Sequence, residues 1–296
     1  MKKLFYAIAL LATLSACNNE NKKTGANVDT NSAVVNESTV HKDLYGMWVG
    51  DFEPVEVKEG APNVQTNKIT LIIKSITEEN DVLGQSIVAG NNRPLKGKLT
   101  SLNDNLNFVL DEPGDDKYDG RFEFELDDDT LVGHWKSYKN TLDVTKRSFR
   151  LVKKSFVYNA NLMLSSNGDY TDYYDKQTRA VIDTIDGKAT EIFIEDFYRT
   201  ASNAVYEINA STDNLTEAEL KKLSKLDLQI LRNTIFARHG YTFKKKNYRQ
   251  FFNPVEWYVP VSSNIDGQLT SLEKKNIALL QKFEKYAEDN YDTFGR

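Results

Sequence analysis

Hydrophobic and polar residues follow two different periods along this chain. From residue 44 to about residue 156, apolar residues alternate with polar ones in short runs, as in Ile69-Thr70-Leu71-Ile72-Ile73. Turn sequences such as Pro113-Gly114-Asp115 separate these runs, and this combination is typical of short antiparallel strands. We expect eight strands, near residues 46–53, 68–77, 82–89, 95–101, 106–111, 119–126, 130–137 and 147–153.

Eight short strands at this spacing predict an all-β region over residues 42–156, either a small antiparallel barrel or a strongly coiled sheet. A barrel of this size either fills its interior with side chains or holds one small ligand, and the pattern allows both. The first strand carries Gly46-Met47-Trp48, and its Gly-x-Trp resembles the opening of lipocalin-like β-barrels. The resemblance implies that Trp48 closes one barrel end beneath an arginine of the last strand, either Arg147 or Arg150.

From about residue 213 onward, apolar residues recur every third or fourth position, which is the spacing of amphipathic helices. Ser224 is placed to cap one helix, and Gly240 is placed to end it in the left-handed conformation. A capping box at Thr270–Glu273 opens a final helix. We expect a small, mostly α-helical domain over residues 213–292, with shorter helices beginning near Thr216 and Lys245. Residues 157–212 are expected to form a less regular connector, with a strand and a short helix over 192–204.

The N-terminus has a different pattern. Lys2 and Lys3 precede an apolar run, 4–14, which is too short to span a bilayer of about 30 Å and has the length of a signal-peptide core. The run ends in Leu14-Ser15-Ala16-Cys17, which resembles the bacterial lipobox. This resemblance implies cleavage before Cys17 and its acylation, and two or three acyl chains hold a protein stably on a membrane. We therefore predict a lipoprotein signal peptide over residues 1–17.

Residues 18–41 are rich in Asn, Thr and Ser and hold almost no large apolar side chain, so we predict a disordered polar tether. A tether behind a lipidated Cys17 would place the folded part at the bacterial cell envelope. Asn18 does not resemble the aspartate that retains lipoproteins at the inner membrane of Gram-negative hosts. That favours the outer membrane, on either its periplasmic or its surface-exposed side. Cys17 is the single cysteine, which leaves none for a disulfide or a thiol nucleophile.

Charge is unevenly distributed in a chain whose net charge is −5. Residues 111–129 hold ten acidic and two basic residues, whereas residues 224–252 hold seven basic residues and one acidic residue. The mild net charge argues against nucleic acid as a partner. The two segments are either solvated faces, a basic face for an anionic partner, or two domains that attract each other.

The basic segment contains Phe236-Ala237-Arg238-His239-Gly240, followed by Tyr241. With Leu231-Arg232-Asn233 before it and Trp257-Tyr258 after it, this sequence resembles the YARHG domain, with Phe236 in place of the first tyrosine. The resemblance covers roughly residues 215–287. It implies an extracellular domain of exported, often lipid-anchored bacterial proteins, and it implies no established activity. The candidate binding or structural residues of this motif are Arg232, Phe236, Arg238, His239, Gly240, Tyr241, Trp257 and Tyr258.

Helix geometry gives Arg238 and His239 a structural reason to lie here, because cations in a last turn interact favourably with the helix dipole. Arg232 and Arg238 lie six residues apart and therefore on different faces. We expect one of them to pair with an acidic residue of the final helix, with Glu273 as the candidate, and Trp257 offers a surface for a guanidinium. The alternative is that Arg238 and His239 bind a ligand.

Other chemistry has little support in the sequence. We find no G-x-S-x-G, no glycine-rich phosphate loop and no H-x-x-x-H. The acidic loop Asp115–Gly120 carries oxygen ligands that attract calcium, but it lacks the ligand order of an EF-hand. We therefore expect no catalytic residue, no metal site and no cofactor.

These observations favour a non-enzymatic binding module at the cell envelope. Its partners would be the membrane, through the lipid anchor, and an anionic polymer such as peptidoglycan or envelope polysaccharide, or an envelope protein, held by the basic C-terminal domain. Two alternatives remain. The barrel would carry a small hydrophobic ligand, or the chain would be a cryptic envelope hydrolase, which needs a histidine or a carboxylate pair in a cleft.

Overall fold

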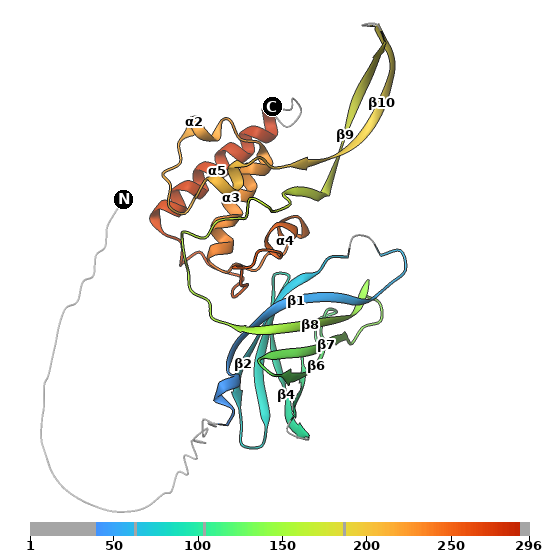
Figure 1. Ribbon diagram of the computed structural model, residues 1–296, viewed down its shortest axis with the longest axis vertical. Helices are drawn as coiled ribbons and strands as arrows, with labels where there is room; N and C mark the ends of the chain where they lie inside the picture. The colour runs from blue at the N-terminus through green and yellow to red at the C-terminus, as the bar shows by residue number, and fades with distance from the viewer. Residues whose placement is uncertain (1–39, 62–63, 103–104, 186–187, 291–296) are drawn as a thin grey trace, which may run out of the picture. The chain divides into compact units, whose positions relative to one another are not determined.

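The computed structural model describes residues 40–61, 64–102, 105–185 and 188–290 (Figure 1). The predicted signal peptide, the predicted lipidation site Cys17 and nearly all of the predicted tether lie outside these residues. Within the described part, no helix combines the length and the apolar content needed to cross a bilayer.

Eight antiparallel strands close into a barrel in sequence order, and β1 pairs with β8 as well as with β2. The prediction of a small antiparallel barrel is confirmed, as are its eight strands. The strands are β1 (Gly46–Val57), β2 (Asn67–Ile76), β3 (Asp81–Val88), β4 (Asn91–Leu102), β5 (Asn105–Asp111), β6 (Gly120–Asp127), β7 (Thr130–Ser137) and β8 (Val144–Lys154).

Apolar side chains from all eight strands fill the lumen. The alternation along each strand turns every second residue inward, so the aromatic residues of β1, β5, β6 and β8 meet there. The rings of Phe108 and Phe124 stack at 4.7 Å, and Phe52 lies 6.2 Å from both Phe122 and Phe149. Of the two possibilities left open by the sequence, this part of the barrel has the filled interior.

One barrel end is covered by the 3-10 helix η1 (Lys42–Leu44) and Trp48, whose indole N–H donates to the Leu44 carbonyl at 2.9 Å. The expectation that Arg147 or Arg150 lies over Trp48 is wrong. The β1–β8 register places Lys153 opposite Trp48, and its Nζ lies 5.7 Å from the ring. Arg147 pairs with Pro54, toward the other barrel end, because antiparallel register moves it away from Trp48.

The C-terminal region is helical, as predicted. The cap expected at Ser224 and the capping box expected at Thr270 both form, and Ser224 also makes a full capping box with Asp227, as Thr270 does with Glu273. Burial of Ile277, Leu280 and Phe283 against the preceding long helix confirms the expected stripe of the last helix. The helices are α1 (Ala204–Glu207), α2 (Glu217–Leu220), α3 (Lys225–Arg238), α4 (Lys246–Phe252) and α5 (Ser271–Asn290).

Much of the expected connector, residues 157–212, is a long two-stranded ribbon. β9 (Thr171–Ile185) pairs with β10 (Lys188–Thr200) in an antiparallel sheet of its own (Figure 1). The sequence predicted a strand near β10 and missed β9. The reason is physical: much of the ribbon is exposed, so β9 carries polar residues without the apolar alternation that marks a half-buried strand.

The barrel and the helices belong to one compact unit, Glu37–Arg296. Hydrogen bonds connect them around the barrel end opposite η1. Lys68 Nζ donates to the Val255 carbonyl at 2.6 Å, and the Gly90 N–H donates to Thr242 Oγ1 at 3.0 Å. These contacts bring the start of α4 to the rim of the barrel.

Candidate functional site

Gly240 ends α3 as the sequence predicted. Its φ is +70°, and its N–H donates to the Ala237 carbonyl at 2.9 Å, while the Tyr241 N–H donates to the Phe236 carbonyl at 3.0 Å. These two bonds form a Schellman motif. A Cβ at Gly240 would lie 2.4 Å from Val261 Cγ2. Both the backbone conformation and the packing therefore require glycine.

Arg238 is 1% exposed, and all three of its guanidinium nitrogens are bonded inside the protein. Nε donates to the Leu162 carbonyl at 2.6 Å, Nη1 to Ser211 Oγ at 3.0 Å, and Nη2 to Met163 Sδ at 3.4 Å. Burial lowers the pKa of Arg238 to about 10, against the raising effect of Tyr158 and Glu273. Arg238 therefore joins the connector to α3.

His239 is 2% exposed and lies beside Glu273 of α5. Its Nε2 is 2.9 Å from Glu273 Oε2, its ring stacks on Tyr158 at 4.1 Å, and the Tyr158 hydroxyl donates to Glu273 Oε1 at 2.9 Å. Burial raises the pKa of Glu273, but hydrogen bonds from His239, the Thr270 N–H, Ser211 and Tyr158 outweigh it and lower the pKa to about 2. The expectation that Glu273 pairs with an arginine is wrong, because the end of α3 directs His239 toward it.

The remaining motif residues also make internal contacts. Arg232 pairs with Glu284 of α5, Nη2 to Oε2 at 3.0 Å, which confirms that one of the two arginines pairs with an acidic residue of the final helix. Its Cζ lies 5.9 Å from the Phe236 ring. The Trp257 indole N–H donates to the Met163 carbonyl at 2.8 Å, and the Tyr258 hydroxyl donates to the Tyr241 carbonyl at 2.8 Å. The structure thus brings Arg238 and His239 together with the connector and α5, in a closed core.

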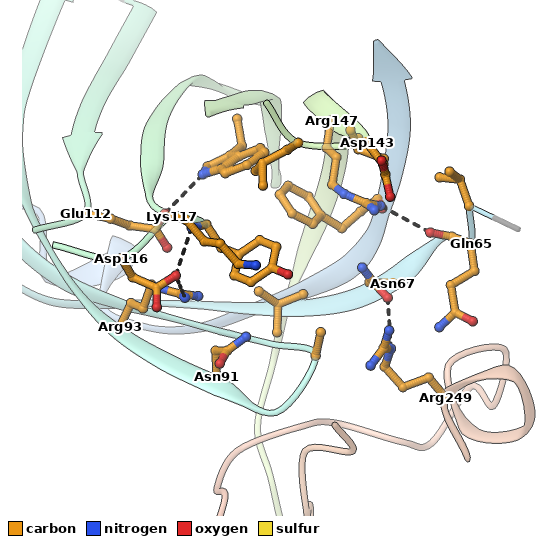
Figure 2. Close-up of a pocket in the computed structure, with 18 of the residues that line it drawn as sticks. Gln65, Asn67, Asn91, Arg93, Glu112, Asp116, Lys117, Asp143, Arg147 and Arg249 are labelled. Carbon is orange, nitrogen blue, oxygen red and sulfur yellow. Dashed lines mark hydrogen bonds and ion pairs between the residues drawn. The ribbon is translucent and has the colours of Figure 1, made fainter. Parts of the chain in front are cut away.

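An open cup of about 640 Å³ lies at the barrel end opposite η1 (Figure 2). The loops β1–β2, β3–β4, β5–β6 and β7–β8 surround it, and the buried rings of Phe52, Phe122 and Trp135 form its floor. Protein sites for small molecules have volumes of roughly 300–1,000 Å³. The cup is therefore large enough for one small ligand.

Positive charge dominates the walls of the cup. The cationic side chains that line it are Arg93, Lys117, Arg147, Lys244, Lys246 and Arg249, and the acidic ones are Glu112, Asp116 and Asp143. Three of the six cations belong to the basic segment 224–252. Arg232 and Arg238 of that segment are engaged inside the helical region. The charge surplus seen in the sequence is therefore partly internal and partly gathered at the cup.

Gly90 allows the basic segment to approach the barrel rim. Its φ is +83°, and a Cβ there would lie only 2.8 Å from Lys244 Cα. The N–H of Gly90 also donates a hydrogen bond to the hydroxyl oxygen of Thr242 at 3.0 Å. The β3–β4 turn thus positions the backbone that presents Lys244 and Lys246.

Arg147 and Arg249 line the cup without an ion-pair partner among the described residues. Arg147 Nη1 donates to the carbonyls of Phe52 at 2.8 Å and Gln65 at 3.2 Å. Arg249 is 8% exposed; its Nε donates to Asn67 Oδ1 at 3.1 Å and its Nη1 to the Lys244 carbonyl. Burial lowers the pKa of both arginines, and the charge of Arg249 helps to lower that of Arg147, to about 10.

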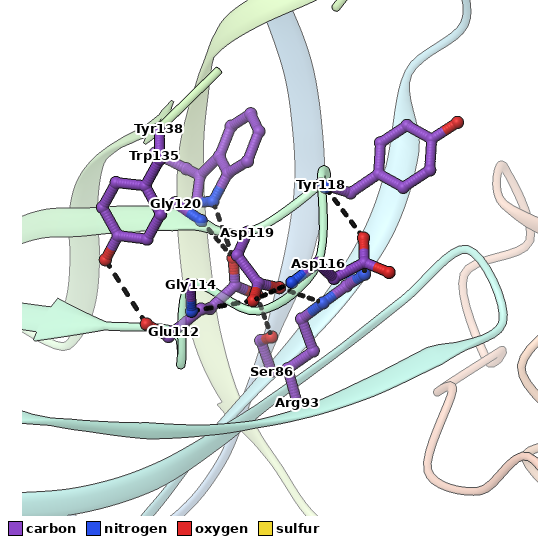
Figure 3. Close-up of polar contacts among 10 residues, drawn as sticks. All are labelled: Ser86, Arg93, Glu112, Gly114, Asp116, Tyr118, Asp119, Gly120, Trp135 and Tyr138. Atoms are coloured by element: carbon purple, nitrogen blue, oxygen red, sulfur yellow. Dashed lines mark hydrogen bonds and ion pairs between the residues drawn. The ribbon is translucent and has the colours of Figure 1, made fainter.

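The other side of the cup holds carboxylates that are already engaged (Figure 3). Glu112 is 5% exposed and accepts hydrogen bonds from Ser86 Oγ at 3.0 Å, the Gly120 N–H at 2.8 Å and Trp135 Nε1 at 3.1 Å. Burial raises the pKa of Glu112, and these hydrogen bonds together with the charge of Arg93 oppose the rise. Glu112 therefore fixes the orientation of Trp135 in the floor.

In the acidic loop Asp115–Gly120, which the sequence offered as a set of calcium ligands, the buried carboxylate is paired with an arginine. Asp119 is fully buried, its Oδ1 lies 2.6 Å from Arg93 Nε, and its Oδ2 accepts the N–H groups of Gly114 and Asp116. Throughout the described ranges, no cluster of His, Cys, Asp or Glu is arranged to hold a metal ion. A guanidinium thus neutralises the carboxylate that calcium would need.

Sequence reasoning did not select Arg147 and Arg249, the two arginines of the cup that have no ion-pair partner among the described residues. Arg147 was considered only as a partner of Trp48, and Arg249 only as one member of a charged segment. One pattern would have found Arg147: it shares its strand face with Phe149 and Leu151, which point into the lumen. A cation on the inward face of a barrel strand needs either a counter-charge or a ligand.

Comparison with known proteins identifies one segment. The family model of the YARHG domain matches residues 204–285, from the start of α1 into α5. This match confirms the resemblance of the C-terminal motif and includes Lys244, Lys246 and Arg249 of the cup, but not the barrel. No curated protein matches the chain, and no solved structure does.

Proposed function

We propose that this protein is an exported, lipid-anchored binding protein of the bacterial cell envelope, and that it holds an anionic ligand in the cup at the barrel mouth. The observation that carries the proposal is the lining of the cup, in which six cations outnumber three carboxylates above an aromatic floor. Such a lining attracts negative charge and offers apolar contact at the same time.

The envelope location has two supports. The sequence around Cys17 resembles a lipobox, and the YARHG match at residues 204–285 agrees with an extracellular or envelope setting. An outer-membrane position is part of the proposal. Replacing Cys17 with serine should move the protein from the membrane fraction to the soluble fraction of a bacterial host. A Cys17→Ser variant that stays with the membrane would contradict the lipid anchor.

The geometry of the cup bears on both ligand hypotheses from the sequence, the hydrophobic ligand of the barrel and the anionic partner of the basic domain. A purely hydrophobic cargo fits poorly, because aromatic and aliphatic side chains fill the lumen and the remaining space has a charged rim. An anionic envelope molecule or the charged end of an envelope polymer fits better. A binding role also agrees with the engaged state of Glu112, which accepts three hydrogen bonds, and of His239, which is enclosed with Glu273.

Ligand capture tests this function. A soluble form that begins at residue 18, and so lacks the predicted lipidation site Cys17, would be incubated with an envelope extract and re-isolated, and bound small molecules would be identified by mass spectrometry. We expect an anionic compound that high salt releases. The double variant Lys244→Glu/Lys246→Glu should retain little of it, whereas Lys245→Glu, which lies outside the cup lining, should retain it fully. Equal retention by both variants would contradict the proposal.

A further inference from the structure

We infer that Arg147, Arg249 and the side-chain amide of Gln65 bind one compact oxyanion, a carboxylate or a phosphate, at the edge of the cup. The rest of the ligand is an apolar ring system that packs on the floor formed by Phe52, Phe122 and Trp135. This inference rests on the proposed function and narrows it from an anionic ligand to an amphipathic oxyanion.

The first argument is the missing counter-charge. Two guanidinium groups share one partly enclosed space and repel each other, and each uses only neutral acceptors within the described residues. Asp143 lines the same cup, but no ion pair joins it to either arginine. Burying charges of the same sign together costs free energy unless an opposite charge compensates them. An oxyanion would supply that compensation.

The second argument is the set of guanidinium nitrogens left over. Nε and Nη2 of Arg147 and Nη2 of Arg249 have no hydrogen-bond partner in the described part of the chain, yet they are not among its buried unbonded polar atoms. They are therefore accessible to solvent, and both arginines line the cup. By contrast, the three nitrogens of Arg238 are all bonded. Guanidinium groups bind carboxylate and phosphate oxygens with two parallel hydrogen bonds, which suits these open nitrogens.

Gln65 gives the third argument. Both its side-chain nitrogen and its side-chain oxygen are buried without a hydrogen-bond partner, and its backbone carbonyl already accepts from Arg147. Figure 2 shows Gln65 and Asn67 on the same side of the cup as Arg147 and Arg249. A buried amide that makes no hydrogen bond is costly. Because this amide makes no hydrogen bond where it lies, the Gln65 side chain would turn toward an oxyanion held by the two arginines and donate its N–H groups to it.

The floor determines what is attached to the oxyanion. Arg147 Cζ lies 5.4 Å from the centre of the Phe52 ring, so the head-group site and the floor adjoin. Phe122 stacks on Phe52 at 6.2 Å, and Glu112 holds the Trp135 indole N–H at 3.1 Å. These rings are fixed before any ligand arrives, and a flat apolar group would pack on them with little reorganisation.

Calorimetric titration with four defined probes tests the inference: 2-naphthyl phosphate, 2-naphthoate, 2-naphthol and inorganic phosphate. At neutral pH we expect the first two to bind at least about tenfold more tightly than the uncharged naphthol, which corresponds to about 1.4 kcal/mol. The same two should bind more tightly than inorganic phosphate, because phosphate lacks the ring. The better of the two identifies the head group as a phosphate or a carboxylate.

Variants then locate the site. Arg147→Gln and Arg249→Gln should each weaken naphthyl phosphate or naphthoate at least about tenfold, because each loses a charged hydrogen bond. Arg150→Gln on the outside of β8 and Lys245→Gln before α4 are matched controls and should bind as the natural protein does. Arg249→Lys, which keeps the charge and loses the forked geometry, should also weaken binding. A cooperative melting transition without ligand checks that each variant is folded, and naphthyl phosphate should raise the melting temperature of the controls but not that of the arginine variants.

Each contrary outcome has a distinct meaning. Naphthol binding as tightly as naphthyl phosphate overturns the assignment of the arginines, and inorganic phosphate binding as tightly overturns that of the floor. If the natural protein retains an anion from the envelope extract, and Arg147→Gln and Arg249→Gln retain it as well as the natural protein does, the proposed function stands and this inference fails. If neither the probes nor any envelope anion binds, both fail.

Discussion

The arginines at the end of α3 and the arginines at the barrel mouth differ in what surrounds them. Arg232 pairs with Glu284, and Arg238 has all three nitrogens bonded in a closed core. Arg147 and Arg249 reach only neutral acceptors and line an open cup. The residues of the sequence motif thus complete a helical core, whereas the uncompensated charges lie where no motif pointed. In this protein, a buried charge without an ion-pair partner identifies the candidate site better than a sequence motif that is rich in charged residues.

The largest effect should come from Arg238→Met. Removing the guanidinium leaves the Leu162 carbonyl and the Ser211 hydroxyl without their donor, and each such loss costs about 1–3 kcal/mol. We expect the free energy of unfolding to fall by about 3 kcal/mol or more, measured by denaturant titration. Arg150→Met, on the exposed outer face of β8, should change it by no more than about 0.5 kcal/mol. A small loss in Arg238→Met would mean that this arginine is not structural.

Gly240→Ala should have the next largest effect. A left-handed φ costs an L-residue about 1–2 kcal/mol, and overlap of the new methyl with Val261 adds a further strain of about 1–3 kcal/mol. We expect a total loss of about 2–5 kcal/mol in the same titration. Gly267→Ala is the matched control, because a Cβ there meets nothing within 4 Å and its φ is not in the left-handed range. Similar losses in both variants would refute the role given to Gly240.

Acidification should reveal the buried carboxylate of Glu273 behind the motif. The folded-state pKa of Glu273 lies at about 2, below the ordinary 4.5, so its stabilisation is complete above about pH 4.5 and is lost as pH falls toward 2. Glu273→Gln should be less stable than the natural protein by about 1–3 kcal/mol at pH 7, because His239 and Tyr158 lose a charged acceptor. Melting curves at pH 7, 4.5 and 3 should show this gap narrowing. A gap that stays constant over that range would contradict the lowered pKa.

The sequence was sufficient for the elements whose local pattern reflects their burial. Alternation predicted the barrel strands, since each has one face in the lumen, and the caps at Ser224, Thr270 and Gly240 predicted helix ends because capping depends on neighbouring residues. β9 was missed because its described part is largely exposed and lacks the apolar alternation of a half-buried strand.

The cup was beyond sequence reasoning for a different reason. Arg147 and Arg249 stand about a hundred residues apart, and only barrel closure together with the approach of Lys244 to Gly90 brings them to one space. The pairing errors at Trp48 and Glu273 have the same origin. In both cases the correct type of partner was expected, but strand register and helix rotation selected Lys153 and His239.

The substitution with the smallest expected effect on stability, Arg249→Met, is the most informative test of the difference between the two groups of arginines. Arg249→Met removes hydrogen bonds to Asn67 and Lys244, which favours unfolding, but it also removes a buried charge that repels Arg147. Replacing buried charges with apolar side chains is often neutral or stabilising. We expect the free energy of unfolding to stay within about 1 kcal/mol of the natural protein or to rise. Arg232→Met, which leaves Glu284 unpaired, should lower it by about 1–2 kcal/mol. A loss above about 2 kcal/mol in Arg249→Met would mean that this arginine stabilises the fold without a ligand, and the contrast between the two groups of arginines would then disappear.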